Sequence, residues 1–435
     1  MADDLKKYYE TYDYSARTPV KIGIDELRPD QKHRLIESKH FCMLPWLHVH
    51  GWPTGEAYSC CLADDKLPLG DLKTSSLADI WNGGKLKNMR RNMLQDQPCA
   101  ECRKCYEQED MGFFSMRNSS NKHFGHHISD VDVTHDDGYH PEFKIRYWDI
   151  RFSNICNFRC RYCGPNFSSN WWEDKAALYG RDSVKHSKFL YAGGNKDAIW
   201  NQMIEHIPHL EQIYFAGGEP LLMEEHYRLL DELIRRDMTD VRLIYNTNFS
   251  ELNYKKNNVL ELWKHFKSVS VGASLDAMGD RAEYMRKGTV WSDIEDNRRR
   301  MIAACPDVDF YISATVSVFN VLHISDFHRD WTNKGLIKAQ DFNVNILQGP
   351  DYYRCDILPA QLKAAVRYKI ESTIAWLQDQ DHLQRATNGY KGIINFIEAK
   401  DNSQLIPEFL RITRQLDSLR SEDFTKTFPE LEGMI

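Results

Sequence analysis

The stretch CNFRCRYC, residues 156–163, places three cysteines within eight residues, at gaps of three and two. It directly follows the apolar, β-rich run KIRYWDIRFS at 144–153, which is typical of a buried strand. The cysteines therefore lie in a loop at the carboxyl end of a predicted strand. The remainder of the chain decides whether this strand belongs to a larger sheet.

Five further β-rich runs lie after the loop, and helical patterns such as 224–237 and 292–305 lie between them. Together with the first run, the expected strands are 144–153, 211–216, 241–247, 268–275, 308–317 and 341–347. Strands alternating with helices predict a parallel sheet with right-handed crossovers. Such sheets carry their chemistry at the carboxyl ends of the strands. We therefore predict an α/β fold, a partial (β/α)6 TIM-like barrel, with the three cysteines at its functional end.

Three neighbouring thiols have a specific use in iron chemistry. A [4Fe–4S] cluster has four irons, each usually held by one thiolate. Cys156, Cys160 and Cys163 would hold three irons and leave the fourth open to a ligand. The alternative is a zinc knuckle, but zinc sites usually take cysteines in C-x2–4-C pairs with a second pair elsewhere.

Composition limits the class of protein. The chain has 435 residues, 42% of them hydrophobic and 27% charged, as in an ordinary globular protein. A net charge of −7 gives no reason to expect a nucleic-acid partner. The first residues lack the apolar core of a signal peptide, and no apolar run approaches the ~20 residues of a membrane span. We expect a cytoplasmic protein without a membrane partner, in which eleven cysteines indicate metal binding rather than disulfides.

The C-x3-C-x2-C spacing resembles the signature of the radical S-adenosylmethionine (SAM) enzymes. The resemblance implies that the open iron binds the amino and carboxylate groups of SAM. It also implies that the reduced cluster cleaves SAM to a 5′-deoxyadenosyl radical, which abstracts a hydrogen atom from a substrate. A reductant such as flavodoxin or ferredoxin is then required.

Further segments resemble the same family in the expected order. FAGGEPLL contains Gly217, Gly218 and Glu219, and resembles the GGE motif that binds the SAM amino group. IYNTNF resembles the TNG segment and contains Asn248, with Phe249 in place of the family's glycine.

ASLDAMGDRAEYMRKG resembles the family's SxDG segment, with Ala277 in place of the glycine. The resemblance implies that Ser274 and Asp276 face the ribose or carboxylate of SAM and that Arg286 faces the carboxylate. Tyr162 occupies the position of the family's aromatic residue beside adenine.

The first 140 residues contain six more cysteines. Residues 42–61 predict two short strands about a Pro-Thr-Gly turn, on which His48 and His50 are expected to form an exposed face rather than to be ligands. A helix weakened at Gly83 and Gly84 is expected over 75–94.

The spacing Cys42-x12-Gly55-x4-Cys60 resembles the opening half of the SPASM pattern, in its shortened "twitch" form with one auxiliary [4Fe–4S] cluster. The implied ligands are Cys42, Cys60, Cys102 and Cys105. Replacement of one ligand by the neighbouring Cys99 or Cys61 stays open, as does a structural zinc site.

These inferences predict an auxiliary-cluster module over 1–140, a radical SAM barrel over 141–355 and a helical extension over 356–435. The expected function is abstraction of a hydrogen atom from a substrate, which we expect to be a peptide or protein. Two alternatives are a small-molecule substrate and a non-catalytic iron–sulfur or zinc binding protein.

Overall fold

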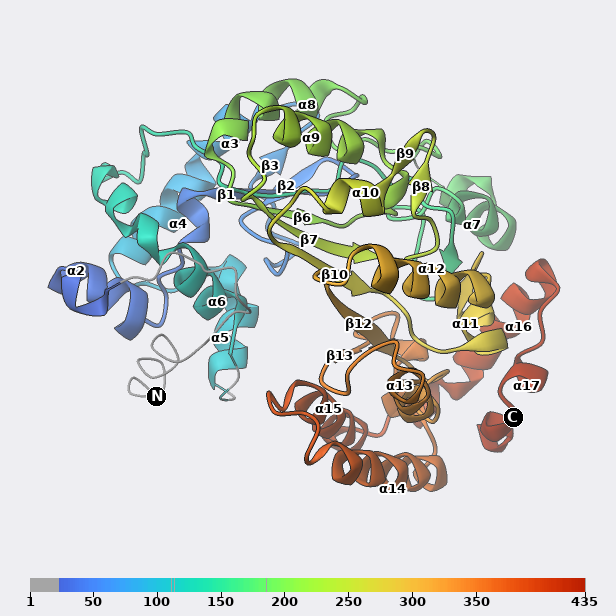
Figure 1. Cartoon of the computed structure of the whole chain (residues 1–435). Coiled ribbons are helices and arrows are strands. Elements are labelled where there is room, and N and C mark those ends of the chain that lie inside the picture. Colours follow the sequence, from blue (N-terminus) through green and yellow to red (C-terminus); the bar gives the residue numbers. More distant parts are fainter. Residues whose placement is uncertain (1–22, 111, 113, 185, 435) are drawn as a thin grey trace. The chain divides into compact units, whose positions relative to one another are not determined.

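The computed structural model describes residues 23–434 apart from 111, 113 and 185 (Figure 1). The N-terminal segment considered as a signal peptide lies outside these residues. The chain forms two compact units: unit 1 comprises 1–153, 191–217 and 232–243, and unit 2 comprises 154–190, 218–231 and 244–435. The domain boundaries expected from the sequence remain a prediction.

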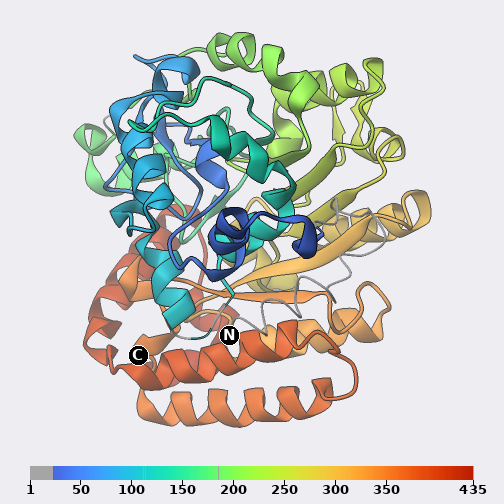
Figure 2. The same cartoon turned by 90° about the vertical axis from the view of Figure 1, so that its left-hand side faces the viewer.

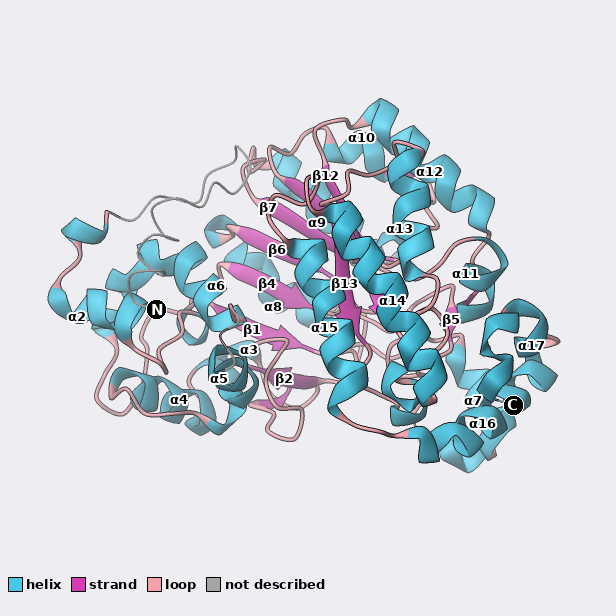
Figure 3. Cartoon of the chain, turned by 90° about the horizontal axis from the view of Figure 1, so that it is seen from below, coloured by secondary structure: helices cyan, strands magenta, loops and turns pink. Residues whose placement is uncertain are grey.

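Unit 1 contains a mixed sheet in the strand order β6-β4-β1-β2-β3. The bounds are β1 His48–Gly51, β2 Glu56–Tyr58, β3 Gly70–Asp71, β4 Tyr147–Ile150 and β6 Gln212–Phe215. β1 and β2 form the predicted antiparallel hairpin, whose turn contains Gly55 at φ +108°. The opposite edge of β1 pairs in parallel with β4, which pairs in parallel with β6 (Figure 3).

The position of β1 overturns one expectation. His48 and His50 were expected on an exposed strand face, yet both side chains are fully buried. The reason is that β1 is an inner strand, paired on both edges, and every one of its residues is buried. Polar residues on such a strand require partners inside the protein.

Helices complete unit 1. Their bounds are α2 Pro29–Lys32, α3 Leu77–Trp81, α4 Gly84–Leu94, α5 Arg103–Asp110, α6 Met116–Phe124 and α8 Ala198–Met203. The helix expected over 75–94 is divided into α3 and α4, with the break at Asn82 and Gly83. Ser76 caps α3 by accepting a hydrogen bond from the backbone N–H of Asp79.

Unit 2 contains the remaining expected strands. Parallel β10 Val269–Ala273, β12 Asp309–Val316 and β13 Phe342–Ile346 are consecutive neighbours, and β7 Arg242–Thr247 has residues in both units. The short strands are β5 Arg159–Cys160, β8 Asn253–Tyr254, β9 Asn257–Asn258 and β11 Arg286–Lys287. Alternate residues of β12 are buried, as expected for a strand with one face on the core.

The helices of unit 2 include the predicted C-terminal extension. Their bounds are α7 Trp171–Tyr179, α10 Val259–Trp263, α11 Gly279–Met285, α12 Trp291–Ala304, α13 Ile324–Asn333, α14 Ala360–Leu377, α15 Arg385–Ala399, α16 Ile406–Arg420 and α17 Phe424–Thr427; α9 Glu224–Arg235 is shared between the units. α14 and α15 lie alongside each other, and α15 also packs on β13 (Figures 2 and 3).

The fold is therefore of the predicted α/β class, with mostly parallel strands and a helical C-terminal region, as in a partial barrel. Within the described ranges, no helix has both the length and the apolar character needed to cross a membrane.

Candidate functional site

The loop with three cysteines lies in unit 2 and is held by backbone contacts. Its middle part, Arg159–Cys160, forms β5, which pairs with β11 so that Cys160 lies opposite Arg286. The N–H of Cys163 donates to the carbonyl of Cys160 at 3.0 Å, which turns the chain between the two thiols. The indole N–H of Trp171 donates to the same carbonyl at 2.6 Å.

The three thiols lie close enough to affect one another. Burial, and then the nearby charge of Cys160, raise the pKa of Cys163 to about 12. The same two causes raise the pKa of Cys156 well above its usual value. The guanidinium of Arg286 donates to the sulfur of Cys160 at 3.6 Å and opposes the effect of burial there. Three converging thiols beside one cation suit an anionic iron–sulfur cluster with one open iron.

Arg286 links the cysteine loop to two other predicted residues. Its Nε donates to Asp276 at 2.6 Å, and the hydroxyl of Tyr162 donates to the same carboxylate oxygen. The other carboxylate oxygen of Asp276 accepts from the N–H of Thr315 at 2.8 Å. The structure therefore brings Tyr162, Asp276 and Arg286 together around Cys160. The sequence contained no signal for Thr315.

Glu219 is fully enclosed and holds three hydrogen bonds. One carboxylate oxygen accepts from the hydroxyl of Thr247 at 2.6 Å and from the N–H of Leu221 at 3.0 Å, and the other accepts from the N–H of Asn248 at 2.7 Å. Burial nevertheless raises the pKa of Glu219 to about 7, because these hydrogen bonds offset only part of the desolvation. A cationic ligand would stabilise the ionised form.

The two positions before Glu219 require glycine for different structural reasons. Gly217 adopts φ +132°, which side chains rarely permit. A Cβ on Gly218 would lie 2.1 Å from the carbonyl oxygen of Ile155, the residue before the first cysteine. The N–H of Glu219 donates to that same carbonyl at 2.7 Å. Only glycine allows this segment to pack so closely on the cysteine loop.

Asn248 also contacts the cysteine loop. Its amide donates to the side-chain oxygen of Asn157 at 2.8 Å. Phe249, which replaces the family's glycine, keeps a left-handed backbone at φ +60°. Its phenyl ring is fully buried and packs against Phe310. Ser274 is half-buried, and its N–H donates to the carbonyl of Thr247 at 2.7 Å.

Arg161, which lies between two of the cysteines, is a residue that sequence reasoning missed. Its side chain is completely buried and forms ion pairs with Asp417 and Glu422, the latter at 2.6 Å. The guanidinium also lies 3.6 Å from the ring centre of Tyr284. The C-terminal extension is thus tied to the cysteine loop by contacts across more than 250 positions of sequence.

A cavity of about 170 Å³ lies beside Cys163. It is bordered by residues of α7 and α16 and by Tyr352 and Tyr353.

Four cysteines of unit 1, Cys42, Cys60, Cys102 and Cys105, lie close enough to influence one another. Burial and the charge of Cys102 raise the pKa of both Cys42 and Cys60, and burial and Cys102 also raise the pKa of Cys105. Cys61 differs, because after burial the main cause that raises its pKa is the charge of Asp149.

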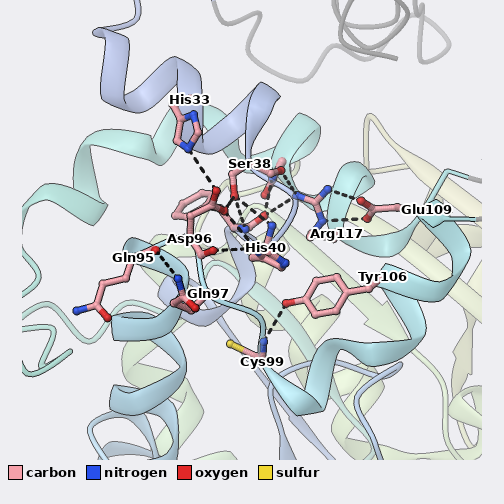
Figure 4. Close-up of polar contacts among 12 residues, drawn as sticks. His33, Ser38, His40, Gln95, Asp96, Gln97, Cys99, Tyr106, Glu109 and Arg117 are labelled. Atoms are coloured by element: carbon pink, nitrogen blue, oxygen red, sulfur yellow. Dashed lines mark hydrogen bonds and ion pairs between the residues drawn. The ribbon is translucent and has the colours of Figure 1, made fainter.

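The segment around Cys99 is well ordered by polar contacts. The N–H of Cys99 donates to the hydroxyl of Tyr106 at 3.2 Å (Figure 4). Arg117 pairs with Glu109 and donates to the carbonyl of Ser38 at 2.9 Å, which orders the chain before Cys42. The thiol of Cys99 hydrogen-bonds with that of Cys102 and raises its pKa, so exchange of Cys99 for a neighbouring ligand stays open.

Comparison with known proteins agrees with this architecture. Residues 150–326 match the family model of the radical SAM superfamily, and residues 42–106 match that of the SPASM iron–sulfur cluster-binding domain. Two segments of the chain thus match, respectively, a domain of the radical SAM superfamily and a domain that binds iron–sulfur clusters. A radical SAM enzyme requires an external reductant and a substrate.

Over 141 residues, the chain is 28% identical to GTP 3′,8-cyclase of Pasteurella multocida (strain Pm70). The match covers 32% of this chain and about a third, 36%, of that protein. Native anSMEcpe with bound AdoMet is a solved structure with 17% identity and a TM-score of 0.36, covering 55% of this chain and 61% of that one. TYW1 with a lysine-pyruvate adduct bound has 12% identity and a TM-score of 0.27, covering 54% and 71% respectively.

Proposed function

We propose that Cys156, Cys160 and Cys163 hold the catalytic [4Fe–4S] cluster and that residues from four other segments bind SAM beside it. The observation that carries this proposal is the chain of contacts from Cys160 through Arg286 to Asp276. In the sequence, Cys160 lies more than 100 positions before Asp276 and Arg286, which are ten positions apart. A structural metal site has no need for this second group of polar residues.

When bound, the reduced cluster supplies one electron to the sulfonium of SAM, which yields methionine and a 5′-deoxyadenosyl radical. The residues of the chain have separate roles. Glu219 accepts the ammonium group of SAM, and its burial makes the charged contact strong. Arg286 faces the carboxylate, and Ser274 and Asp276 face the ribose or carboxylate. Asp276 also accepts a hydrogen bond from Arg286. Tyr162 lies beside adenine, and Asn248 joins the Glu219 segment to the cysteine loop.

We further propose that Cys42, Cys60, Cys102 and Cys105 hold one auxiliary [4Fe–4S] cluster. The mutual influence of their thiols supports this set, and Cys61 is left out because, after burial, the charge of Asp149 affects its pKa more than any cysteine does. The auxiliary module then occupies about 1–140, the barrel 141–355 and the helical extension 356–435.

The substrate that we propose is a peptide or protein, because the family resemblance associates SPASM and twitch modules with such substrates. A small-molecule substrate is the second candidate, favoured by the 28% identity to a GTP 3′,8-cyclase over 141 residues. Flavodoxin or ferredoxin is the proposed reductant.

Formation of 5′-deoxyadenosine tests the catalytic assignment. The anaerobic protein, given SAM and a strong reductant, should form it. Cys160→Ala should abolish it, whereas Cys102→Ala should still cleave SAM while losing turnover of the substrate. Cys305→Ala is the matched control, because this thiol is buried apart from both groups and donates to the carbonyl of Leu260. Circular dichroism and iron content must first show that each variant is folded.

The opposite pattern, with activity in Cys160→Ala and none in Cys102→Ala, would refute the two roles. The substrate class needs a second measurement. Extracts of deuterated cells are separated by size, and transfer of deuterium into 5′-deoxyadenosine is followed for each fraction. Transfer from the macromolecular fraction supports a peptide or protein, and transfer from the small-molecule fraction alone excludes it.

A further inference from the structure

A buried group of three side chains in unit 1 has no role in the proposed reaction. The parallel register of β1 and β4 places His48 opposite Tyr147 and His50 opposite Asp149. Because side chains two apart on a strand share a face, both imidazoles project to the same side of β1. His48, His50 and Asp149 are each 0% exposed.

The hydrogen bonds of the two histidines define which ring nitrogen carries the proton. Nδ1 of His48 lies 2.8 Å from the carbonyl oxygen of Tyr147, and Nδ1 of His50 lies 2.9 Å from that of Asp149. A carbonyl only accepts, so Nδ1 is the donor in each neutral ring and Nε2 retains a lone pair. Throughout the described part of the chain, neither Nε2 atom has a hydrogen-bond partner.

The carboxylate of Asp149 adds a third acceptor. One oxygen lies 2.9 Å from Nδ1 of His50, whose proton is shared with the backbone carbonyl. The other lies 3.7 Å from Nε of Arg151, which is beyond hydrogen-bond distance. One ligand atom from each of the three side chains lies within 4.8 Å of the others. Three side chains that each carry an acceptor atom therefore lie together in a buried space, and within the described residues Arg151 is a cation beside them, at ion-pair distance from Asp149.

An ion pair between His50 and Asp149 alone explains less of this arrangement than a bound metal ion does. Such an ion pair uses only Nδ1 of His50, and it leaves the Nε2 atoms of both rings without a partner among the described residues. Imidazoles whose second nitrogen donates to a backbone carbonyl are typical of metal ligands, because the carbonyl fixes the direction of the ring.

We propose that His48, His50 and Asp149 form a site for a divalent ion of the zinc class, separate from both cysteine groups. Two imidazole nitrogens and one carboxylate oxygen are a ligand set that zinc accepts. The rings are already held in place. His48 stacks on Tyr147 with ring centres 4.3 Å apart, and His50 meets Trp52 edge to face.

Zinc binding to the anaerobic, iron-loaded protein tests the site. Zinc content after dialysis is measured, and zinc K-edge X-ray absorption gives the ligand distances. Nitrogen and oxygen ligands lie at about 2.0–2.2 Å and sulfur ligands at about 2.3 Å, so the proposed site is distinguishable from zinc held by cysteines. We expect one zinc per chain with a shell dominated by nitrogen and oxygen.

Asp149→Asn preserves the shape of the side chain and should lower zinc affinity by at least ~10-fold, since even outer-shell changes have effects of that size. The double variant His48→Gln, His50→Gln should lose the nitrogen and oxygen shell. His140→Gln is the matched control, because His140 is also buried in unit 1 and lies against Trp81. Absence of bound zinc, a shell of sulfur alone, or equal binding by the wild type and both site variants would overturn the proposal.

Discussion

Replacement of Glu219 by glutamine should remove the pH dependence of SAM binding. Burial raises the pKa of Glu219 to about 7 from an ordinary 4.5. The carboxylate is therefore charged above pH 7 and takes up a proton as the pH falls through 7. The raised pKa means that the ionised form of Glu219 lowers the free energy of unfolding by roughly 3 kcal/mol at high pH, at 1.36 kcal/mol per pKa unit. The ammonium group of SAM offsets that cost.

The magnitude follows from the ionised fraction, which is about one half at pH 7.0 and one tenth at pH 6.0. SAM should therefore bind about fivefold, or ~1 kcal/mol, more weakly at pH 6.0. The amino group of SAM stays protonated over this range. Isothermal titration calorimetry with the oxidised, cluster-loaded protein measures the affinity without turnover.

Two variants complete the experiment. Glu219→Gln should bind weakly and equally at both pH values, because its side chain has no charge to lose. Glu251→Gln removes an exposed carboxylate and should behave as the wild type. A wild-type affinity that changes by less than about twofold between pH 6.0 and 7.0, or an unchanged pH dependence in Glu219→Gln, would refute the assigned role.

Three further predictions concern the cysteine loop and the two clusters. Gly218→Ala forces a Cβ against a backbone carbonyl and should slow SAM cleavage by at least ~10-fold. Gly164→Ala is the control, because a Cβ at that position has no atom within 4 Å and should not slow cleavage. Equal rates for the two variants would contradict the packing argument. Arg161→Met removes the fully buried guanidinium from Asp417 and from Glu422, which keeps its ion pair with Lys287, and should lower the free energy of unfolding by ~1–3 kcal/mol, while Arg411→Met, which breaks an exposed pair, should cost under ~1 kcal/mol in the same denaturant titration. The reconstituted protein should contain about eight irons, and Cys102→Ser about four; stoichiometric zinc at the cysteines, or only four irons in the wild type, would remove the auxiliary cluster.

The sequence was sufficient to predict those features whose physical cause lies within a short stretch of the chain. The six expected strands all form, because buried parallel strands need apolar runs and the helices between them need a 3.6-residue period. The spacing of Cys156, Cys160 and Cys163 predicts a site for the same reason: three thiols within one loop are close together in any conformation of that loop. The hairpin turn at Gly55 is also local, since its positive φ favours glycine.

Tertiary structure decided the features that depend on distant pairing. His48 and His50 were placed on an exposed face, because the sequence of a four-residue strand does not reveal whether a second strand covers its other edge. Pairing with β4, nearly 100 residues later, buries both rings and brings Asp149 to them. Arg161 likewise resembles an ordinary charged loop residue until α16 supplies Asp417. Burial and ion pairing depend on all residues that are close in space, including those far away in the sequence. A local sequence pattern contains information only about residues that are close in the sequence.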